Sequence, residues 1–307
     1  MSDNLARWCN ASTLLGSLVW IALFAAALDP IQRVLSLALL VVTPLLLPLV
    51  DTPSAFYRGA MVIQPLCAAL ALAAFFAPQG IGGAVLTIPW LMLSGLVALY
   101  GLSRLRQGGL RRIDEHCIDA AMLYLPVGAV WLLLSRLGGM PLGFAEPTVT
   151  LTAVHFHYAG FATPILAAMT GRKLLEVRPA AWPLYRVAAF GVIGGPPLLA
   201  IGITFSPLVE VIAALWLSIS LALLGLLVLF VIAPRAASRL AQTLLTVSCG
   251  ASLAAMCFAA VYAVGEFSGS ALIDIPQMAR LHGLANALGF VLCGALAWRL
   301  LQRKSLP

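Results

Sequence analysis

The sequence predicts an all-α integral membrane protein: a polytopic bundle of about ten transmembrane helices with both termini in the cytoplasm. Hydrophobic residues make up 62% of the 307 residues and charged residues only 9%, whereas soluble globular proteins carry roughly 25% charged residues. The apolar residues gather into runs of the length that crosses a bilayer, about 20 residues per helix. Connections rich in Lys and Arg alternate along the chain with connections that contain few of these residues, which is typical of a membrane protein.

Turn-forming or charged residues bound each apolar run, and the runs are too long and too irregular for β-strands. The expected helices cover residues 11–28, 31–50, 58–77, 81–101, 117–137, 148–170, 185–204, 207–233, 241–265 and 280–302. They form a single transmembrane domain, 1–307. An alternative is two five-helix halves, 1–137 and 146–302, which would have inverted topology as in many transporters. The first run could also be read as a cleaved signal peptide, but it is nearly long enough to span the membrane.

Charge distribution gives the orientation. With a cytoplasmic N-terminus, 15 of the 18 Lys and Arg residues lie inside, and only Arg33, Arg136 and Arg280 lie outside. This bias indicates cytoplasmic loops. The basic residues do not cluster on one face, as they would in a nucleic-acid-binding protein, so no nucleic-acid partner is expected. The expected partner is the lipid bilayer, with anionic headgroups at two Arg-rich inner loops, 104–112 and 171–186.

The sixth expected helix has the most polar sequence. It carries Thr148, Thr152, His155, His157 and Tyr158. In a regular helix His155 shares a face with Thr148, Thr152 and Tyr158, and His157 lies on the opposite face. His157 would there orient a neighbouring group such as Glu146. The two histidines could bind one metal only if the helix were locally broken, and the alternative is that both are structural and satisfied by hydrogen bonds.

The seventh expected helix carries Gly194, Gly195, Pro196 and Pro197 near its middle. Two glycines and two prolines in succession predict an interruption. Broken helices often form substrate sites in transporters, so Gly194 and Gly195 are candidate substrate contacts. The alternative is a kink that serves only packing.

Further ionisable residues fall on the predicted outer side: Glu210, Glu266, Arg280 and His282. Isolated charges are costly at membrane depth. We therefore expect Glu210, Glu266 and His282 to approach the two histidines in one cavity near the outer surface, although Arg280 could instead be a solvated loop residue. On the inner side, Asp114, Glu115 and Asp119 open the fifth helix, where they could pair with nearby arginines.

The segment 151–161, Leu-Thr-Ala-Val-His-Phe-His-Tyr-Ala-Gly-Phe, resembles the hallmark of the bacterial YndJ-like membrane proteins. The resemblance implies a bacterial cytoplasmic membrane and singles out His155 and His157. It implies no reaction, so no catalytic role is carried over.

Two functions fit this pattern. The favoured one is a transporter of a small molecule, with a His/Glu cavity open to the extracytoplasmic side. The alternative is an intramembrane enzyme acting on a lipid or another apolar substrate, and a third is a scaffold or sensor without turnover. The candidate catalytic or proton-transferring residues are His155, His157, Glu210 and Glu266. The candidate substrate contacts are Tyr158, Gly194, Gly195, Arg280 and His282, and the candidate ligands of a divalent metal are His155, His157 and His282.

Overall fold

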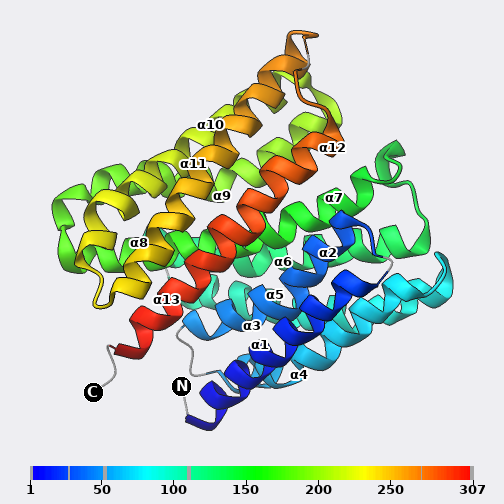
Figure 1. The fold of residues 1–307 in the computed structure, drawn as a ribbon, viewed down its shortest axis with the longest axis horizontal. Helices are drawn as coiled ribbons and strands as arrows, with labels where there is room; N and C mark the ends of the chain where they lie inside the picture. Colours follow the sequence, from blue (N-terminus) through cyan, green and yellow to red (C-terminus); the bar gives the residue numbers. More distant parts are fainter. Residues whose placement is uncertain (1–2, 27, 51–53, 109–111, 271, 305–307) are drawn as a thin grey trace. The chain divides into compact units, whose positions relative to one another are not determined.

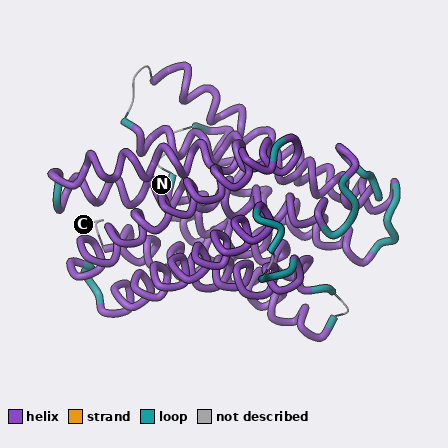
Figure 2. The backbone as a smooth tube through the Cα atoms, turned by 90° about the horizontal axis from the view of Figure 1, so that it is seen from above, coloured by secondary structure: helices purple, strands orange, loops and turns teal. Residues whose placement is uncertain are grey.

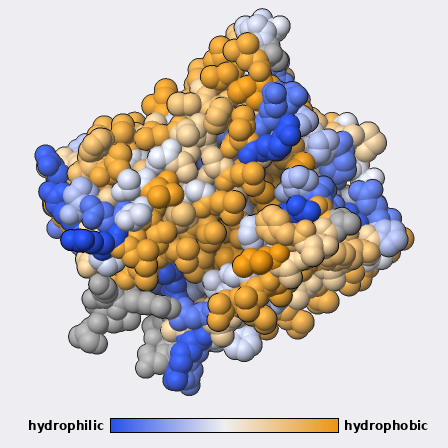
Figure 3. Space-filling view, viewed as in Figure 1, coloured by the Kyte–Doolittle hydropathy of each residue, from blue (hydrophilic) through white to orange (hydrophobic). Residues whose placement is uncertain are grey.

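The structure is a computed structural model that describes residues 3–26, 28–50, 54–108, 112–270 and 272–304. Within these ranges the chain is built from helices and short connections, without a β-strand (Figure 2). In this described part of the chain, nine helices are long and apolar enough to cross a membrane. Hydrophobic residues cover most of the face drawn in Figure 3, as expected of a protein whose solvent is lipid. Arg111 of the first Arg-rich inner loop lies outside the described residues.

The remaining expected helix, residues 148–170, is also present. Helix α7 (Thr148–His155), the π-helix η6 (Phe156–Ala162) and helix α8 (Thr163–Val177) follow one another without a gap. This continuous segment, called the sixth span below, is not among the nine, in keeping with the threonines and histidines of its outer half. The all-helical membrane fold predicted from the sequence is therefore confirmed.

The chain divides into two compact units. Unit 1 contains Met1–Leu110 and Ile118–Ala162, and unit 2 contains Arg111–Cys117 and Thr163–Pro307. Their borders differ from those of the two sequence halves, because the chain passes from one unit to the other inside the sixth span and inside the first turns of helix α6.

Unit 1 contains the first five spans and the outer part of the sixth, drawn from blue to green in Figure 1. Its helices are α1 (Asp3–Ala22) with η1 (Leu23–Ala25), α2 (Pro30–Leu37), η2 (Ala38–Val42), α3 (Thr43–Leu46), η3 (Leu47–Leu49), α4 (Ala55–Ala73) with η4 (Ala74–Phe76), α5 (Ile81–Gly108), most of α6 (Ile113–Leu137), η5 (Pro141–Gly143), α7 and η6. The segment from α2 to η3 is the most buried of the nine spans and forms the centre of the unit.

The central segment of unit 1 needs hydrogen-bond donors from its neighbours. In the π-helical turn η2, the carbonyl of Leu39 would pair with the amide five residues later, but that residue is Pro44, which has no N–H. The Gln64 side chain of α4 replaces this donor, with Nε2 2.7 Å from the Leu39 carbonyl oxygen. A lone glutamine in an apolar run is thus explained by a backbone irregularity in another span.

Unit 2 contains the inner part of the sixth span and the last four spans. Its helices are α8, η7 (Pro179–Ala181), α9 (Trp182–Phe205), α10 (Pro207–Leu227), η8 (Val228–Ile232), η9 (Ala233–Arg235), α11 (Arg239–Phe267), α12 (Ile275–Met278), η10 (Ala279–Gly283), η11 (Ala285–Leu292) and α13 (Cys293–Lys304). Helices α9 and α10 are antiparallel neighbours joined through Ser206, and α10 packs in turn on α11 (Figure 1). Ser206 caps α10, and Ser238 caps α11, each through its hydroxyl oxygen.

The predicted interruption of the seventh span is wrong. Helix α9 runs without a break from Trp182 to Phe205 and includes both prolines. The glycines instead allow close packing on α10. A Cβ atom at Gly191 would lie 1.9 Å from Ser220 Oγ, and a Cβ atom at Gly195 would lie 2.8 Å from Leu217 Cδ1. The glycines therefore serve contact between helices, whereas the alternative interpretation was a kink that serves only packing.

Candidate functional site

The two histidines of the sixth span lie where it changes from an α-helix to a π-helix. His155 is the last residue of α7, and His157 is the second residue of the π-helix η6. A π-helical turn holds more residues than an α-helical turn, so the regular spacing assumed from the sequence does not apply beyond Phe156. The two side chains differ in burial: His157 is buried, whereas His155 is partly exposed.

His157 makes hydrogen bonds through both ring nitrogens. Its Nε2 lies 3.0 Å from Trp90 Nε1 of α5, and its Nδ1 lies 2.7 Å from the carbonyl oxygen of Ala153. Because the indole N–H can only donate and the carbonyl can only accept, His157 is neutral, with its proton on Nδ1. The glycine at position 128 makes room for the ring, since a Cβ there would lie 2.6 Å from Nδ1.

This arrangement makes His157 a poor metal ligand, since its only ring lone pair already accepts a hydrogen bond from Trp90. Among the described residues, no group of three or more His, Cys, Asp or Glu side chains is placed to hold a metal ion. The structure thus gives no support to a metal centre formed by His155, His157 and His282. Sequence reasoning missed Trp90, and its only signal was a tryptophan inside an apolar run.

A polar stripe remains on the other face of the sixth span. Thr148, Thr152 and His155 recur at helical spacing and are partly exposed, as is Ala159 in the π-helix, whereas Val149, Ala153, Phe156 and Phe161 are buried. Tyr158, which was expected on this stripe, is buried instead, and its hydroxyl donates to the carbonyl of Val34 at 2.9 Å. The π-helical turn between His155 and Tyr158 accounts for the difference.

Glu146 was expected beside His157, but the structure shows no contact between these two described side chains. Its carboxylate accepts hydrogen bonds from the Ser135 hydroxyl at 2.5 Å, the Thr150 hydroxyl at 2.7 Å and the Thr150 amide at 3.1 Å. It therefore satisfies an amide in the first turn of α7 and ties that turn to the end of α6. Its role in the structure is to fix the start of the sixth span.

The other candidate residues belong to unit 2 and do not all meet. Glu210 at the start of α10 lies near Glu266 and Tyr262 of α11. His282 lies beside Ala255 of the same helix, with Nδ1 2.9 Å from the Ala255 carbonyl oxygen. Eleven residues separate Ala255 from Glu266, which is about 16 Å along a helix axis. His282 therefore lies deeper than expected, and not beside Glu266.

His282 is held in the same way as His157. Its Nδ1 donates to a backbone carbonyl, and its Nε2 lies 3.1 Å from the side-chain nitrogen Nδ2 of Asn286. Arg280 points elsewhere: it is exposed, with Nε 3.4 Å from the carbonyl oxygen of Pro276. Gly194 and Gly195 pack against Trp216 and Leu217 of α10. A cavity that joins the residues of unit 2 to His155 and His157 remains a prediction.

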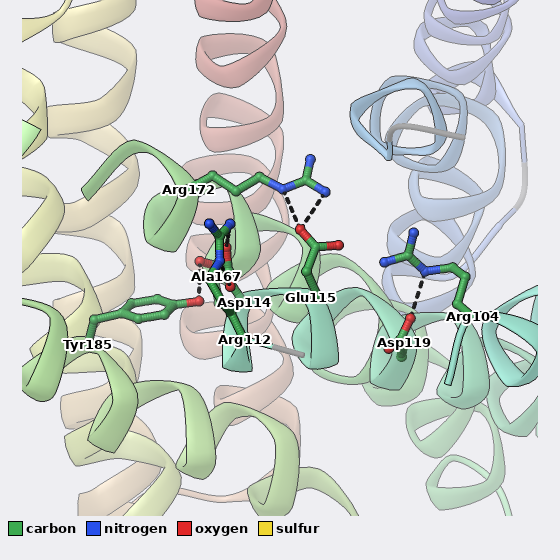
Figure 4. Close-up of polar contacts among 8 residues, drawn as sticks. All are labelled: Arg104, Arg112, Asp114, Glu115, Asp119, Ala167, Arg172 and Tyr185. Carbon is green, nitrogen blue, oxygen red and sulfur yellow. Dashed lines mark hydrogen bonds and ion pairs between the residues drawn. The ribbon is translucent and has the colours of Figure 1, made fainter. Parts of the chain in front are cut away.

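The first two turns of α6 carry a second set of ionisable groups (Figure 4). In unit 2, Arg112 binds Asp114 at 2.7 Å, and Arg172 of α8 binds Glu115 at 2.9 Å. In unit 1, Arg104 of α5 binds Asp119 at 2.7 Å. The hydrogen bond to Asp114 raises the pKa of the Arg112 guanidinium. The expected pairing with arginines of the 104–112 loop is confirmed for Asp114 and Asp119, whereas Glu115 pairs with Arg172 of the second inner loop. Several basic residues of the two inner loops are thus engaged within the protein.

Comparisons with known proteins agree with the membrane fold. A family described as YndJ-like protein matches residues 33–290 of the chain. The "Uncharacterized membrane protein YndJ" of Bacillus subtilis (strain 168) is 28% identical over 298 residues, which cover 95% of this chain and 53% of that protein. The chain thus spans about half the length of this curated relative, and no solved structure matches it. Because the family match covers most of the chain and includes the two histidines of the sixth span, the protein belongs to the YndJ-like family.

Proposed function

We propose that this protein is a transporter of a small polar solute in the cytoplasmic membrane of a bacterium. The observation that carries the proposal is the partly exposed stripe of Thr148, Thr152 and His155 in the outer half of the sixth span. Polar groups at membrane depth are tolerated where they are buried in protein or line a water-filled cavity. A partly exposed stripe of threonine and histidine in a span therefore favours a water-filled pathway over contact with lipid.

The helix geometry also supports transport. The sixth span changes from the π-helix η6 to α8 between Ala162 and Thr163, and Pro164 follows at once. The chain passes from unit 1 to unit 2 at the same place. Alternating access commonly uses the movement of one helix bundle against another, and a π-turn followed by a proline is a place where a helix bends. The sixth span would in this way couple the two units during transport.

The proposal is tested by the accessibility of cysteines introduced along the sixth span, in a variant whose six native cysteines are replaced. In right-side-out vesicles, a membrane-impermeant thiol reagent should modify Thr152→Cys and Ala159→Cys. The matched controls Val149→Cys and Ala153→Cys lie on the buried face of the same span and should stay unmodified. In inside-out vesicles, Ala159→Cys should also react, because a transport pathway opens to both sides.

Two results would count against transport. Equal labelling of Thr152→Cys and Val149→Cys would show that the stripe does not line a water-filled space. Labelling of Thr152→Cys and Ala159→Cys from the outer side alone would indicate a one-sided cavity, which suits an intramembrane enzyme better than a carrier.

A further inference from the structure

Unit 2 contains an internal cavity where four of its spans meet. The cavity has a volume of about 20 Å³, and its eleven lining residues come from α8, α10, η8, α11, η11 and α13. All eleven residues are buried. A cavity needs about 10–15 Å³ to hold one water molecule. This cavity therefore has room for one water molecule, and it is too small for an organic solute.

Polar side chains from two spans line the cavity. They are Thr170 of α8 and Ser248 and Cys249 of α11. The Thr170 hydroxyl donates to the carbonyl oxygen of Leu166 at 2.9 Å, and the Ser248 hydroxyl donates to that of Phe290 at 2.7 Å. A hydroxyl group has one proton and two acceptor lone pairs, so both hydroxyl protons are already used. The two hydroxyl oxygens can still accept, and a suitable occupant is a donor.

Glycines keep side chains out of the space beside these polar groups. A Cβ atom at Gly294, which also lines the cavity, would lie 2.9 Å from Ser248 Oγ. At Gly225, another lining residue, the nearest atoms to a Cβ would be 3.9 Å away and would include the carbonyl oxygen of Cys249. An alanine methyl group would thus enter the cavity at Gly225 without a clash.

We propose that one water molecule binds in this cavity and connects α8 to α11. It donates one hydrogen bond to Thr170 Oγ1 and one to Ser248 Oγ, and it lies beside the Cys249 thiol. Cavities that stay empty are apolar, whereas buried water typically satisfies two to four polar groups. The inner half of the sixth span is then held to α11 through a molecule that can exchange. This water site is independent of the transport pathway proposed above.

A sodium ion is the competing occupant, because hard cations also bind oxygen ligands. Among the described residues that line the cavity, none carries a carboxylate. A buried charge without a counter-charge is costly, so the lining favours a neutral donor. Water meets this requirement and has two donors on one atom.

Hydroxyl-radical footprinting with brief X-ray pulses tests the proposal on the full-length protein in detergent micelles. Radiolysis of a bound water molecule oxidises the side chains that touch it, including those that bulk water does not reach. Mass spectrometry should therefore detect oxidised Cys249, although this residue is only 3% exposed. Cys117 is the matched control, because it is also buried and does not line the cavity. It should stay unmodified.

Gly225→Ala should abolish the oxidation of Cys249, because its methyl group takes the place of the water molecule. Gly250→Ala is the matched control: it lies on α11, has no atom within 4 Å of its Cβ position and does not line the cavity. This variant should be oxidised as wild type is.

Three results would overturn the water site. The first is equal oxidation of Cys249 and Cys117, whether both are modified or neither is. The second is undiminished oxidation of Cys249 in Gly225→Ala. The third is a fall in Cys249 oxidation when sodium chloride replaces choline chloride, which would assign the cavity to the cation. Equal oxidation in the two salts is the result expected for water.

Discussion

The hydrogen bond between Trp90 and His157 joins two spans inside unit 1. Both side chains are buried, so removal of the donor leaves the Nε2 acceptor of His157 without its partner. We expect Trp90→Phe to lower the free energy of unfolding by roughly 1–3 kcal/mol. Denaturant titration in mixed micelles measures this change, and Trp8→Phe on the exposed surface of α1 should change stability by less than about 0.5 kcal/mol.

A double substitution separates the hydrogen bond from packing. In His157→Phe the indole N–H has already lost its acceptor, so the further change Trp90→Phe should then lower stability less than it does in wild type. Additive effects of the two substitutions would contradict the hydrogen bond as the source of the stability.

The pair of Arg104 and Asp119 gives a second expectation at the scale of single residues. The side chains are 8% and 1% exposed, and a buried charge that loses its partner is costly. Asp119→Asn should destabilise unit 1 by about 3–5 kcal/mol, whereas Glu176→Gln in the exposed pair with Lys173 should change stability by at most about 1 kcal/mol.

Replacement of both members of the buried pair provides the control. Arg104→Met together with Asp119→Leu should be less destabilised than Asp119→Asn alone, because no uncompensated charge remains. Thermal unfolding in detergent compares the variants. Equal destabilisation by the single and double changes would show that packing, not charge, dominates at this position.

At the scale of the helix, the contact between α9 and α10 depends on glycines. A Cβ atom at Gly202 would lie 2.4 Å from the backbone nitrogen of Glu210, and a backbone atom cannot move aside as a side chain can. We expect Gly202→Ala to lower the free energy of unfolding by about 1–3 kcal/mol. Gly250→Ala on α11, with open space around its Cβ position, should be neutral or stabilising, because alanine favours a helix by about 1 kcal/mol over glycine. Equal melting temperatures for the two variants would argue against close packing here.

The sequence predicted the helices better than their interruptions. Long apolar runs fixed the existence of the spans, because a membrane leaves few alternatives to a helix. The last span, however, begins at Ile275 rather than at residue 280: Asp274 and Gln277 form a capping box around Pro276, a signal that was present in the sequence. The break expected in α9 does not occur, because both prolines are accommodated within a continuous helix.

The candidate site was harder to predict for a different reason. The polarity of the sixth span was visible in the sequence, but the partner of His157 lies 67 residues away in an apolar run. The shift of Tyr158 away from His155 depends on the π-turn. No residue type in this segment predicts such a turn. Contacts that join distant spans depend on how the spans pack against one another, and a single sequence does not reveal this packing.

At the scale of the whole molecule, the distribution of Lys and Arg sets the orientation. Fifteen of these 18 residues lie on the predicted inner side, and such a bias is decisive for most multispanning proteins. A phosphatase reporter that is active only outside the cytoplasm should be inactive when fused after Pro307 or within 104–112. A fusion within 138–147 should be active. The reverse pattern would place each loop on the opposite side of the membrane.

The π-helix at Phe156–Ala162 has a kinematic consequence. Each residue of an α-helix advances the chain by about 100° around its axis, so an extra residue held in a wide turn stores about that much rotation. If the wide turn moved along the span, the segment it crossed would turn like a screw while both ends stayed anchored. A rotation of about 100° would bring Thr152 to the direction that Ala153 now has, and would do so without any hydrogen-bonded end of the span being pulled free.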